Sequence, residues 1–249
     1  MTKTPFSLDN KRILITGGAS GIGKATAIMC SEMGADLVLV DLNEEGLNLT
    51  AQEIGKESTE VRALDLTNLE QLEAMISTLP KLDGVVSNAG IVYSLLAKFN
   101  EPKDMERIFN INTFSHINLI QGLINQKKLN KGASIVFTSS MSGVFCGFVG
   151  GGLYGATKSA LAGYAKALAI ELAPRGIRVN TIHPGMIETP LTKDTSLSQD
   201  LLNEDAKTYP LGRYGKPEEV AAAMVYLLSD ATMWMTGTQL LIDGGYSVK

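Results

Sequence analysis

Short apolar runs alternate with stretches of helical periodicity along almost the whole chain. Seven apolar runs lie at residues 12–16, 37–40, 61–64, 84–86, 134–138, 177–182 and 238–242. Helical stretches follow them at 21–33, 43–54, from 67 onwards, and at 102–126, 153–173 and 217–228. Such alternation indicates a parallel sheet with right-handed crossovers, because parallel strands need long connections that helices supply. We therefore predict an α/β fold with one doubly wound domain, in which a seven-stranded parallel sheet carries helices on both faces.

The composition limits the classes of function that the chain can carry. It has 22 Lys and Arg against 26 Asp and Glu, a net charge of −4, and no basic cluster, so we expect no nucleic-acid partner. Two cysteines, Cys30 and Cys146, and two histidines, His116 and His183, are too few for a disulfide scaffold or an ordinary metal site. There is no run of about 18 apolar residues and no apolar segment of a secretion signal before the first strand. We expect one domain over residues 1–249, without metal or membrane contact, in the cytoplasm.

The turn after the first apolar run contains the glycine-rich segment Thr16-Gly17-Gly18-Ala19-Ser20-Gly21-Ile22-Gly23. Glycines at this place let the backbone turn tightly, approach a pyrophosphate closely and pack the helix against the strand. The helix that follows offers free N–H groups and the positive end of its dipole to phosphates. The same glycines could serve a tight strand–helix turn alone. Their position between the first strand and the first helix favours dinucleotide binding by a Rossmann-type domain.

An acidic residue, Asp41, ends the second apolar run, 18 positions after Gly23. At the carboxyl end of a strand, its carboxylate can accept hydrogen bonds from both hydroxyls of an adenosine ribose, whereas it repels a 2′-phosphate. We therefore expect NAD(H) to be preferred, with NADP(H) as the other cofactor that the fold can hold. The alternative is that Asp41 only caps the next helix.

A second acidic residue, Asp65, ends the third apolar run. Two interpretations stay open for it, a contact with adenine or the capping of a helix. Thr67, followed three residues later by Glu70, has the spacing of a capping box. That spacing predicts that the next helix begins at Thr67.

Tyr154 and Lys158 are four residues apart in a helical stretch, so their side chains lie on one helix face. A free tyrosine, with a pKa of about 10, is a poor base at neutral pH. A neighbouring ammonium favours the phenolate and lowers that pKa. Such a tyrosine can protonate a carbonyl oxygen during reduction or deprotonate an alcohol during oxidation. Taken alone, a pair at this spacing is more often an exposed aromatic residue beside a solvated lysine.

Several motifs together give the chain a specific resemblance. In order they are Thr16-Gly17-x-x-x-Gly21-x-Gly23, Asn88-Ala89-Gly90, Asn112, Ser140, Tyr154 with Lys158, and Pro184-Gly185. From about residue 11 to residue 245, the chain resembles the short-chain dehydrogenase/reductase family. It is most similar to the branch that contains 3-oxoacyl-acyl-carrier-protein reductases and many sugar, polyol and hydroxysteroid dehydrogenases. Ser87 stands where the family usually has the first Asn of Asn-Asn-Ala-Gly.

The resemblance implies roles for the catalytic residues. Tyr154 is the general acid/base, and Lys158 binds the nicotinamide ribose and lowers the pKa of Tyr154. Ser140 orients the substrate oxygen, although Ser139 and Ser142 flank it and only the family register selects it. Asn112 holds a water that links Lys158 to bulk solvent. His183 is expected to be a structural residue at a strand end rather than a base.

The resemblance also implies a cofactor site and a lid. The cofactor-binding residues are Gly17, Ser20, Gly21, Ile22, Gly23, Asp41, Leu42, Asp65, Leu66, Asn88, Ala89, Gly90, Tyr154, Lys158, Pro184, Gly185, Ile187 and Thr189. Asn88 also braces neighbouring strands beside the cofactor. A lid is expected at about 188–212, over a pocket for a partly apolar substrate.

These expectations combine into a function. We predict an NAD(H)-dependent oxidoreductase that interconverts a small-molecule ketone and a secondary alcohol. The alternatives are a 3-oxoacyl-acyl-carrier-protein reductase that uses NADPH and, more remotely, a dinucleotide-binding sensor that has lost catalysis. Because family members pair the helices corresponding to 102–126 and 153–173 between subunits, we also expect a homotetramer.

Overall fold

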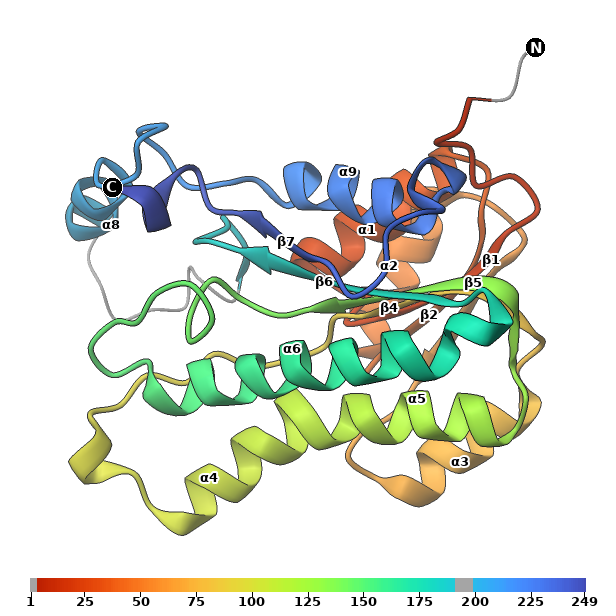
Figure 1. The fold of residues 1–249 in the computed structure, drawn as a ribbon, viewed down its shortest axis with the longest axis horizontal. Coiled ribbons are helices and arrows are strands. Elements are labelled where there is room, and N and C mark those ends of the chain that lie inside the picture. The colour runs from red at the N-terminus through yellow and green to blue at the C-terminus, as the bar shows by residue number, and fades with distance from the viewer. Residues whose placement is uncertain (1–3, 191–198) are drawn as a thin grey trace.

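A seven-stranded sheet forms the centre of the molecule. The computed structural model describes residues 4–190 and 199–249 (Figure 1). The strands are β1 (Arg12–Thr16), β2 (Asp36–Asp41), β3 (Thr59–Ala63), β4 (Leu82–Ser87), β5 (Leu129–Thr138), β6 (Arg178–Pro184) and β7 (Gln239–Ile242). They are ordered β3-β2-β1-β4-β5-β6-β7, and every neighbouring pair is parallel. The predicted parallel sheet of seven strands is confirmed.

Helices cover both faces of this sheet. One face carries α1 (Gly21–Glu32), α2 (Glu44–Ile54) and α9 (Pro217–Leu228), and the other carries α3 (Leu69–Thr78), α4 (Pro102–Phe109), α5 (Ser115–Asn125) and α6 (Gly152–Leu172) (Figure 1). Another helix, α8 (Gln199–Ala206), lies beyond the sheet, on the side toward which the strands point (Figure 1). The result is one Rossmann-like domain, as the alternation of elements predicts.

Alternation along each strand builds two apolar layers. In β1, Ile13 and Ile15 face the layer beneath α1 and α9, whereas Leu14 faces the layer beneath α5 and α6. All three side chains are fully buried. Because successive side chains of a strand point to opposite faces, a strand covered on both faces must be apolar throughout. This explains the continuous apolar runs in the sequence.

Two predicted element boundaries are wrong. The helix expected from Thr67 begins at Leu69, with Asn68 as its N-cap, because the side chain of Asn68 accepts from Gln71 N–H at 3.1 Å. Both the hydroxyl and the N–H of Thr67 donate to Asp65 Oδ1 instead. The strand expected at 134–138 begins five residues earlier, at Leu129, which pairs with Leu82 in β4.

The long helix expected at 102–126 contains a break in its regular winding. Between α4 and α5 the chain forms a π-helix, η2 (Asn110–Phe114). A π-helical turn accommodates one extra residue within an otherwise continuous helix, and such turns are frequent at functional sites. Asn112 lies in this turn.

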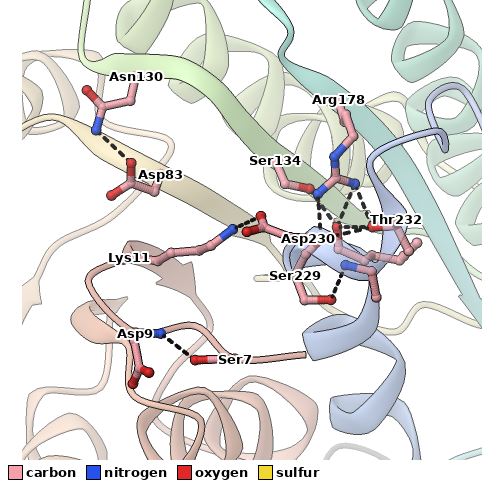
Figure 2. Close-up of polar contacts among 12 residues, drawn as sticks. Ser7, Asp9, Lys11, Asp83, Asn130, Ser134, Arg178, Ser229, Asp230 and Thr232 are labelled. Atoms are coloured by element: carbon pink, nitrogen blue, oxygen red, sulfur yellow. Dashed lines mark hydrogen bonds and ion pairs between the residues drawn. The ribbon is translucent and has the colours of Figure 1, made fainter. Parts of the chain in front are cut away.

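A buried cation, Arg178, lies at the amino end of β6, at the end of the sheet opposite the site described below (Figure 2). Arg178, which begins β6, donates to the carbonyls of Leu227 and Ser229 at 2.8 and 3.1 Å and to Thr232 Oγ1 at 2.8 Å. Ser134 Oγ also donates to the Leu227 carbonyl, at 2.8 Å. These donors satisfy carbonyls that the end of α9 leaves unpaired.

None of the helices in the described part of the chain is both long enough and apolar enough to cross a bilayer.

Candidate active site

The candidate site lies where the strand order reverses. β1 and β4 are neighbours, and the connection that leaves the carboxyl end of β1 leads to β2 on one side, whereas the one that leaves β4 leads to β5 on the other. In doubly wound sheets, ligands bind in the crevice at such a switch point. The glycine-rich turn after β1 and the Asn88-Ala89-Gly90 turn after β4 both lie at this switch point, at the carboxyl ends of the strands.

The backbone of the glycine-rich turn has conformations and close contacts that only glycine accommodates. Gly17 and Gly21 have φ values of +72° and +52°, which favour glycine. A Cβ on Gly23 would lie 2.0 Å from the Gly17 carbonyl oxygen, so α1 packs on the turn only with glycine there. Ser20, the exposed N-cap of α1, makes no side-chain capping bond among the described residues.

The two acidic residues at strand ends have different surroundings. Asp41 Oδ2 accepts from Ala19 N–H at 3.1 Å, and Oδ1 accepts from Asn43 N–H at 3.0 Å. Its carboxylate is thereby fixed against the glycine-rich turn. The N-cap of α2 is Asn43 rather than Asp41. Asp65 is exposed, and its carboxylate accepts from Thr67. Neither carboxylate therefore serves as a helix N-cap.

The turn after β4 is held by neighbouring elements. Asn88 Nδ2 donates to the Thr16 carbonyl at 3.2 Å, and Asn88 Oδ1 accepts from Thr138 Oγ1 at 3.0 Å. Asn88 thus bridges β1 and β5. Thr16 Oγ1 accepts from the N–H groups of Asn88 and Ala89, at 2.8 and 3.1 Å. Sequence reasoning assigned no role to Thr16 or Thr138, although Thr16 opens the glycine-rich motif.

The π-helix places Asn112 against the same turn. Its side-chain amide is fully buried and pairs with both backbone groups of Ile91: Oδ1 accepts from N–H at 2.8 Å, and Nδ2 donates to the carbonyl at 2.9 Å. Nδ2 also lies 3.3 Å from Thr157 Oγ1 on α6. A methyl group built on Gly90 would lie 3.1 Å from Asn112 Oδ1 and 3.4 Å from Lys158 Nζ. The turn is therefore packed between Asn112 and Lys158.

Tyr154 and Lys158 lie one turn apart at the start of α6, with Lys158 Nζ 5.9 Å from the centroid of the Tyr154 ring. Lys158 is buried, and its Nζ donates to the Thr138 carbonyl at 3.0 Å. The pair is not the exposed tyrosine and solvated lysine of the alternative interpretation. Burial lowers the pKa of the Lys158 ammonium to about 8.

The pKa of Tyr154 differs from the sequence expectation in direction. Burial raises it above the ordinary value, and a hydrogen bond between its hydroxyl and Ser140 opposes this increase. In the protein without cofactor, burial therefore has a larger effect on the Tyr154 pKa than the lowering expected from Lys158. The phenolate loses more hydration free energy on burial than the surrounding groups restore.

The three neighbouring serines have separate roles. Ser140 bonds with Tyr154, which agrees with the family register. Ser139 Oγ donates to the Lys158 carbonyl at 2.9 Å and so joins β5 to α6. Ser142 donates its backbone N–H to Ser140 Oγ at 3.1 Å. His183 is buried, with Nδ1 on the Ser140 carbonyl and Nε2 on Thr181 Oγ1, which makes it a structural residue of the strand end.

The segment after β6 crosses the glycine-rich turn. Pro184 accepts from Met141 N–H, and Gly185 N–H donates to Ile242. Thr189 is buried, and its methyl group would lie 3.1 Å from a Cβ on Gly21. Of the expected lid at 188–212, the structure describes 188–190 and 199–212, and residues 191–198 lie outside the described ranges.

These features fit a dinucleotide. Gly17 and Gly23 let the turn pack closely on Asn88 and α1, and α1 directs its N-terminal dipole at the turn without an acidic residue in its first turn. The Ser140 and Tyr154 hydroxyls lie together beside the carboxyl end of β5, on the other side of β4 from β1. The remaining predicted cofactor residues also follow the carboxyl ends of strands: Ile22 after β1, Leu42 after β2, Leu66 after β3 and Ile187 after β6.

Comparison with known proteins assigns the chain to a family. A family model described as enoyl-(acyl carrier protein) reductase matches residues 17–247. The chain is 36% identical over 246 residues to a 3-oxoacyl-[acyl-carrier-protein] reductase of Thermotoga maritima, covering 96% of this chain and 98% of the relative. It is 34% identical to an NAD-dependent glycerol dehydrogenase of Listeria innocua, covering 98% of this chain and 96% of that relative.

A solved structure agrees with these matches. The 3-ketoacyl-(acyl-carrier-protein) reductase of Brucella melitensis, complexed with NADH, superposes with a TM-score of 0.87 at 31% identity, over 97% of this chain and all of that one. The family binds a nicotinamide dinucleotide, and its members act on CH–OH groups. From its sequence, its sheet and the residues at its switch point, the chain belongs to the short-chain dehydrogenase/reductase family.

Proposed function

We propose that this protein is an NAD(H)-dependent oxidoreductase that interconverts a ketone and a secondary alcohol, with Tyr154 as general acid/base. The observation that carries the proposal is the grouping of Ser140, Tyr154 and Lys158. Two hydroxyls in hydrogen-bond contact, beside a buried ammonium, can hold and protonate one carbonyl oxygen. An intact set of this kind argues against a sensor without catalysis.

In the proposed reaction the bound nicotinamide supplies or accepts the hydride. Tyr154 gives its hydroxyl proton to the ketone oxygen during reduction, and Ser140 hydrogen-bonds that oxygen as negative charge develops. Lys158 binds the nicotinamide ribose and supports the phenolate electrostatically. Asn112 holds a water through which Lys158 exchanges protons with solvent.

The walls beside Tyr154 indicate the substrate class. The sequence has no charged residue from Ser87 to Ala97 or from Ser139 to Thr157, the segments that follow β4 and β5. The two segments are joined by Leu95 N–H, which donates to the Gly150 carbonyl at 3.0 Å. Their exposed apolar side chains are Val92, Leu95, Leu96, Phe145, Phe148 and Val149. We infer an uncharged, partly apolar ketone, since an ion entering such walls loses hydration without gaining a partner.

The test is NADH oxidation over matched ketones, for example cyclohexanone and 4-oxocyclohexanecarboxylate. The neutral ketone should have at least about a tenfold higher kcat/KM, because an unpaired charge is costly to desolvate. If no ketone or alcohol in a broad panel changed the NADH signal, the proposed reaction would be wrong. Equal use of both members would contradict only the substrate class.

A second candidate is a 3-oxoacyl-acyl-carrier-protein reductase that uses NADPH. The relative from Thermotoga maritima, named for that activity, favours it. Asp41 counts against it, because a carboxylate at the ribose repels a 2′-phosphate. Assay of a 3-oxoacyl thioester with each cofactor separates the two candidates.

The cofactor preference gives a direct prediction. The unaltered protein should have a markedly higher kcat/KM with NADH than with NADPH. Asp41→Asn keeps an acceptor for Ala19 N–H but removes the charge, and hydrogen bonds to charged groups contribute about 1.5–3 kcal/mol. The variant should therefore narrow the preference by about tenfold or more. Asp65→Asn, a matched change at the next strand end, should leave the ratio unaltered. Equal or better use of NADPH by the unaltered protein would refute the assignment.

Assembly gives another prediction. Apolar side chains are exposed on the helices expected to pair between subunits, at Met105, Phe114 and Ile170. β7 is the last strand of the sheet, and Trp234, which precedes it in the chain, is fully exposed. We expect a homotetramer, with a dimer as the alternative. Light scattering at micromolar concentration should give about four times the chain mass, and the mass of one chain would contradict the proposal.

A further inference from the structure

The turn after β4 has a further support on α5, at His116. His116, on α5, is four residues after Asn112 and is buried. Its Nε2 lies 2.8 Å from the Ala89 carbonyl oxygen, and its Nδ1 lies 2.5 Å from Ser87 Oγ. Both ring nitrogens of His116 are therefore hydrogen-bonded to residues at the end of β4 and the start of the turn.

The chemistry of these partners determines the tautomer of His116. A carbonyl oxygen can only accept, so Nε2 carries the proton. Nδ1 must then accept, and the Ser87 hydroxyl donates to it. Burial, with a contribution from the charge on Lys158, lowers the pKa of His116 to about 3. The ring consequently stays neutral, with its N–H directed at Ala89.

With His116 included, hydrogen bonds fix the backbone N–H and C=O groups of both Ala89 and Ile91. The N–H of Ala89 donates to Thr16 Oγ1, and its carbonyl accepts from His116. Both backbone groups of Ile91 pair with Asn112. Gly90 lies between these fixed points, where a Cβ would come within 3.4 Å of Lys158 Nζ. A displacement of the turn would reach the Lys158 ammonium through Thr138, which donates to Asn88 Oδ1 and accepts from Lys158 Nζ.

We propose that Ser87 and His116 form a positioning pair, in which the Ala89 carbonyl sets the Nε2–H tautomer of His116, Ser87 satisfies Nδ1, and His116 fixes the turn that is linked to Lys158 through Thr138. The pair touches neither substrate nor cofactor in this assignment. Its kinetic effect rests on the proposed function, whereas its tautomer can be measured without turnover.

Two substitutions of His116 separate the two nitrogens. A glutamine amide nitrogen reaches about as far from the backbone as Nε2, so His116→Gln keeps a donor for the Ala89 carbonyl. An asparagine amide reaches only as far as Nδ1, so His116→Asn leaves that carbonyl unpaired. We expect His116→Asn to lower kcat by about 10- to 100-fold, the effect of a small misplacement near the reacting groups. His116→Gln should remain within about threefold of the unaltered protein, and KM for the ketone should change little in both variants.

A matched control separates positioning from general stability. Ser134→Ala also removes one buried hydrogen bond, to the Leu227 carbonyl, at the opposite edge of the sheet (Figure 2). It should lower Tm without changing kcat. A kcat loss in His116→Asn no greater than that of Ser134→Ala, or an equal loss in the Gln and Asn variants, would overturn the proposal.

The tautomer provides a readout that does not depend on activity or on a disruptive variant. In ¹⁵N NMR of the histidine side chains, His116 should show a protonated Nε2 and an unprotonated Nδ1 across the neutral pH range. Ser87→Ala removes only the donor to Nδ1, so it should keep the Nε2–H tautomer, shift the Nδ1 resonance, and lower kcat less than His116→Asn does. Protonation at Nδ1 in the unaltered protein would overturn the proposal. Failure of every ketone assay with the Nε2–H form intact would instead count against the proposed function.

Discussion

Replacing Tyr154 with phenylalanine should lower kcat by about 10²- to 10⁴-fold while leaving NADH affinity almost unchanged. The substitution keeps the ring, and with it the packing at the start of α6, but removes the only group proposed to transfer a proton to the substrate oxygen. Steady-state kinetics and a fluorescence titration with NADH measure the two quantities separately. Near-normal turnover would show that Tyr154 is not the acid/base.

The pH dependence follows from the same assignment. In the oxidative direction the phenolate is the base, so the rate of the unaltered enzyme should rise as pH increases through the Tyr154 pKa. Burial raises that pKa in the protein alone, and the Ser140 hydroxyl opposes the shift. Ser140→Ala should therefore move the rising limb to higher pH, in addition to lowering kcat. If the rising limb of the pH–rate profile stayed at the same pH in this variant, a group other than Tyr154 would be the one that titrates.

Replacing Lys158 with methionine should reduce turnover by a factor of about 10² or more and weaken NADH binding, yet increase stability at neutral pH. Burial lowers the pKa of Lys158 from 10.5 to about 8, so the folded protein holds this charge less well than the unfolded chain. A shift of that size corresponds to about 3 kcal/mol, less the hydrogen bond to the Thr138 carbonyl. Methionine fills much of the same space without the charge.

The sign of this effect gives a second test. Between about pH 8 and 10 the unfolded chain binds more protons than the folded protein, so the unaltered protein gains stability as pH rises through that window. The stability advantage of Lys158→Met should therefore be largest below pH 8 and shrink toward pH 10. Thermal unfolding at several pH values, without cofactor, measures it. A variant that is less stable at every pH would show that the ammonium contributes net stability.

The parallel sheet could be predicted from the sequence because burial on both faces requires continuous apolar runs, which periodicity reveals. The first five residues of β5 escaped the prediction because Asn130, Lys131 and Gly132 are polar or small and match no strand pattern. Asn68 was overlooked as an N-cap, since its neighbour Thr67 has the spacing of a capping box. Helix caps depend on which side chain reaches the free N–H groups, and neighbouring polar residues compete for them.

The candidate site, too, could be predicted only in part from the sequence. Tyr154, Lys158 and the glycine-rich turn are short-range patterns, so their spacing alone places them on one helix face or in one turn. The contacts of His116 with Ser87 and Ala89 join residues 29 and 27 positions apart, and depend on how α5 packs against β4. The pKa of Tyr154 depends on burial, which spacing does not reveal.

The π-helix at Asn110–Phe114 has a consequence for anyone who recombines this protein with its relatives. Each residue of an α-helix turns the chain by about 100°, so one residue more or less in this segment rotates everything before it relative to everything after it. A chimera joined inside α4–α5, with a donor segment of regular winding, would direct the Asn112 amide away from Ile91. Crossovers should therefore fall in the loops before Pro102 or after Asn125, so that both halves of the helix come from one parent.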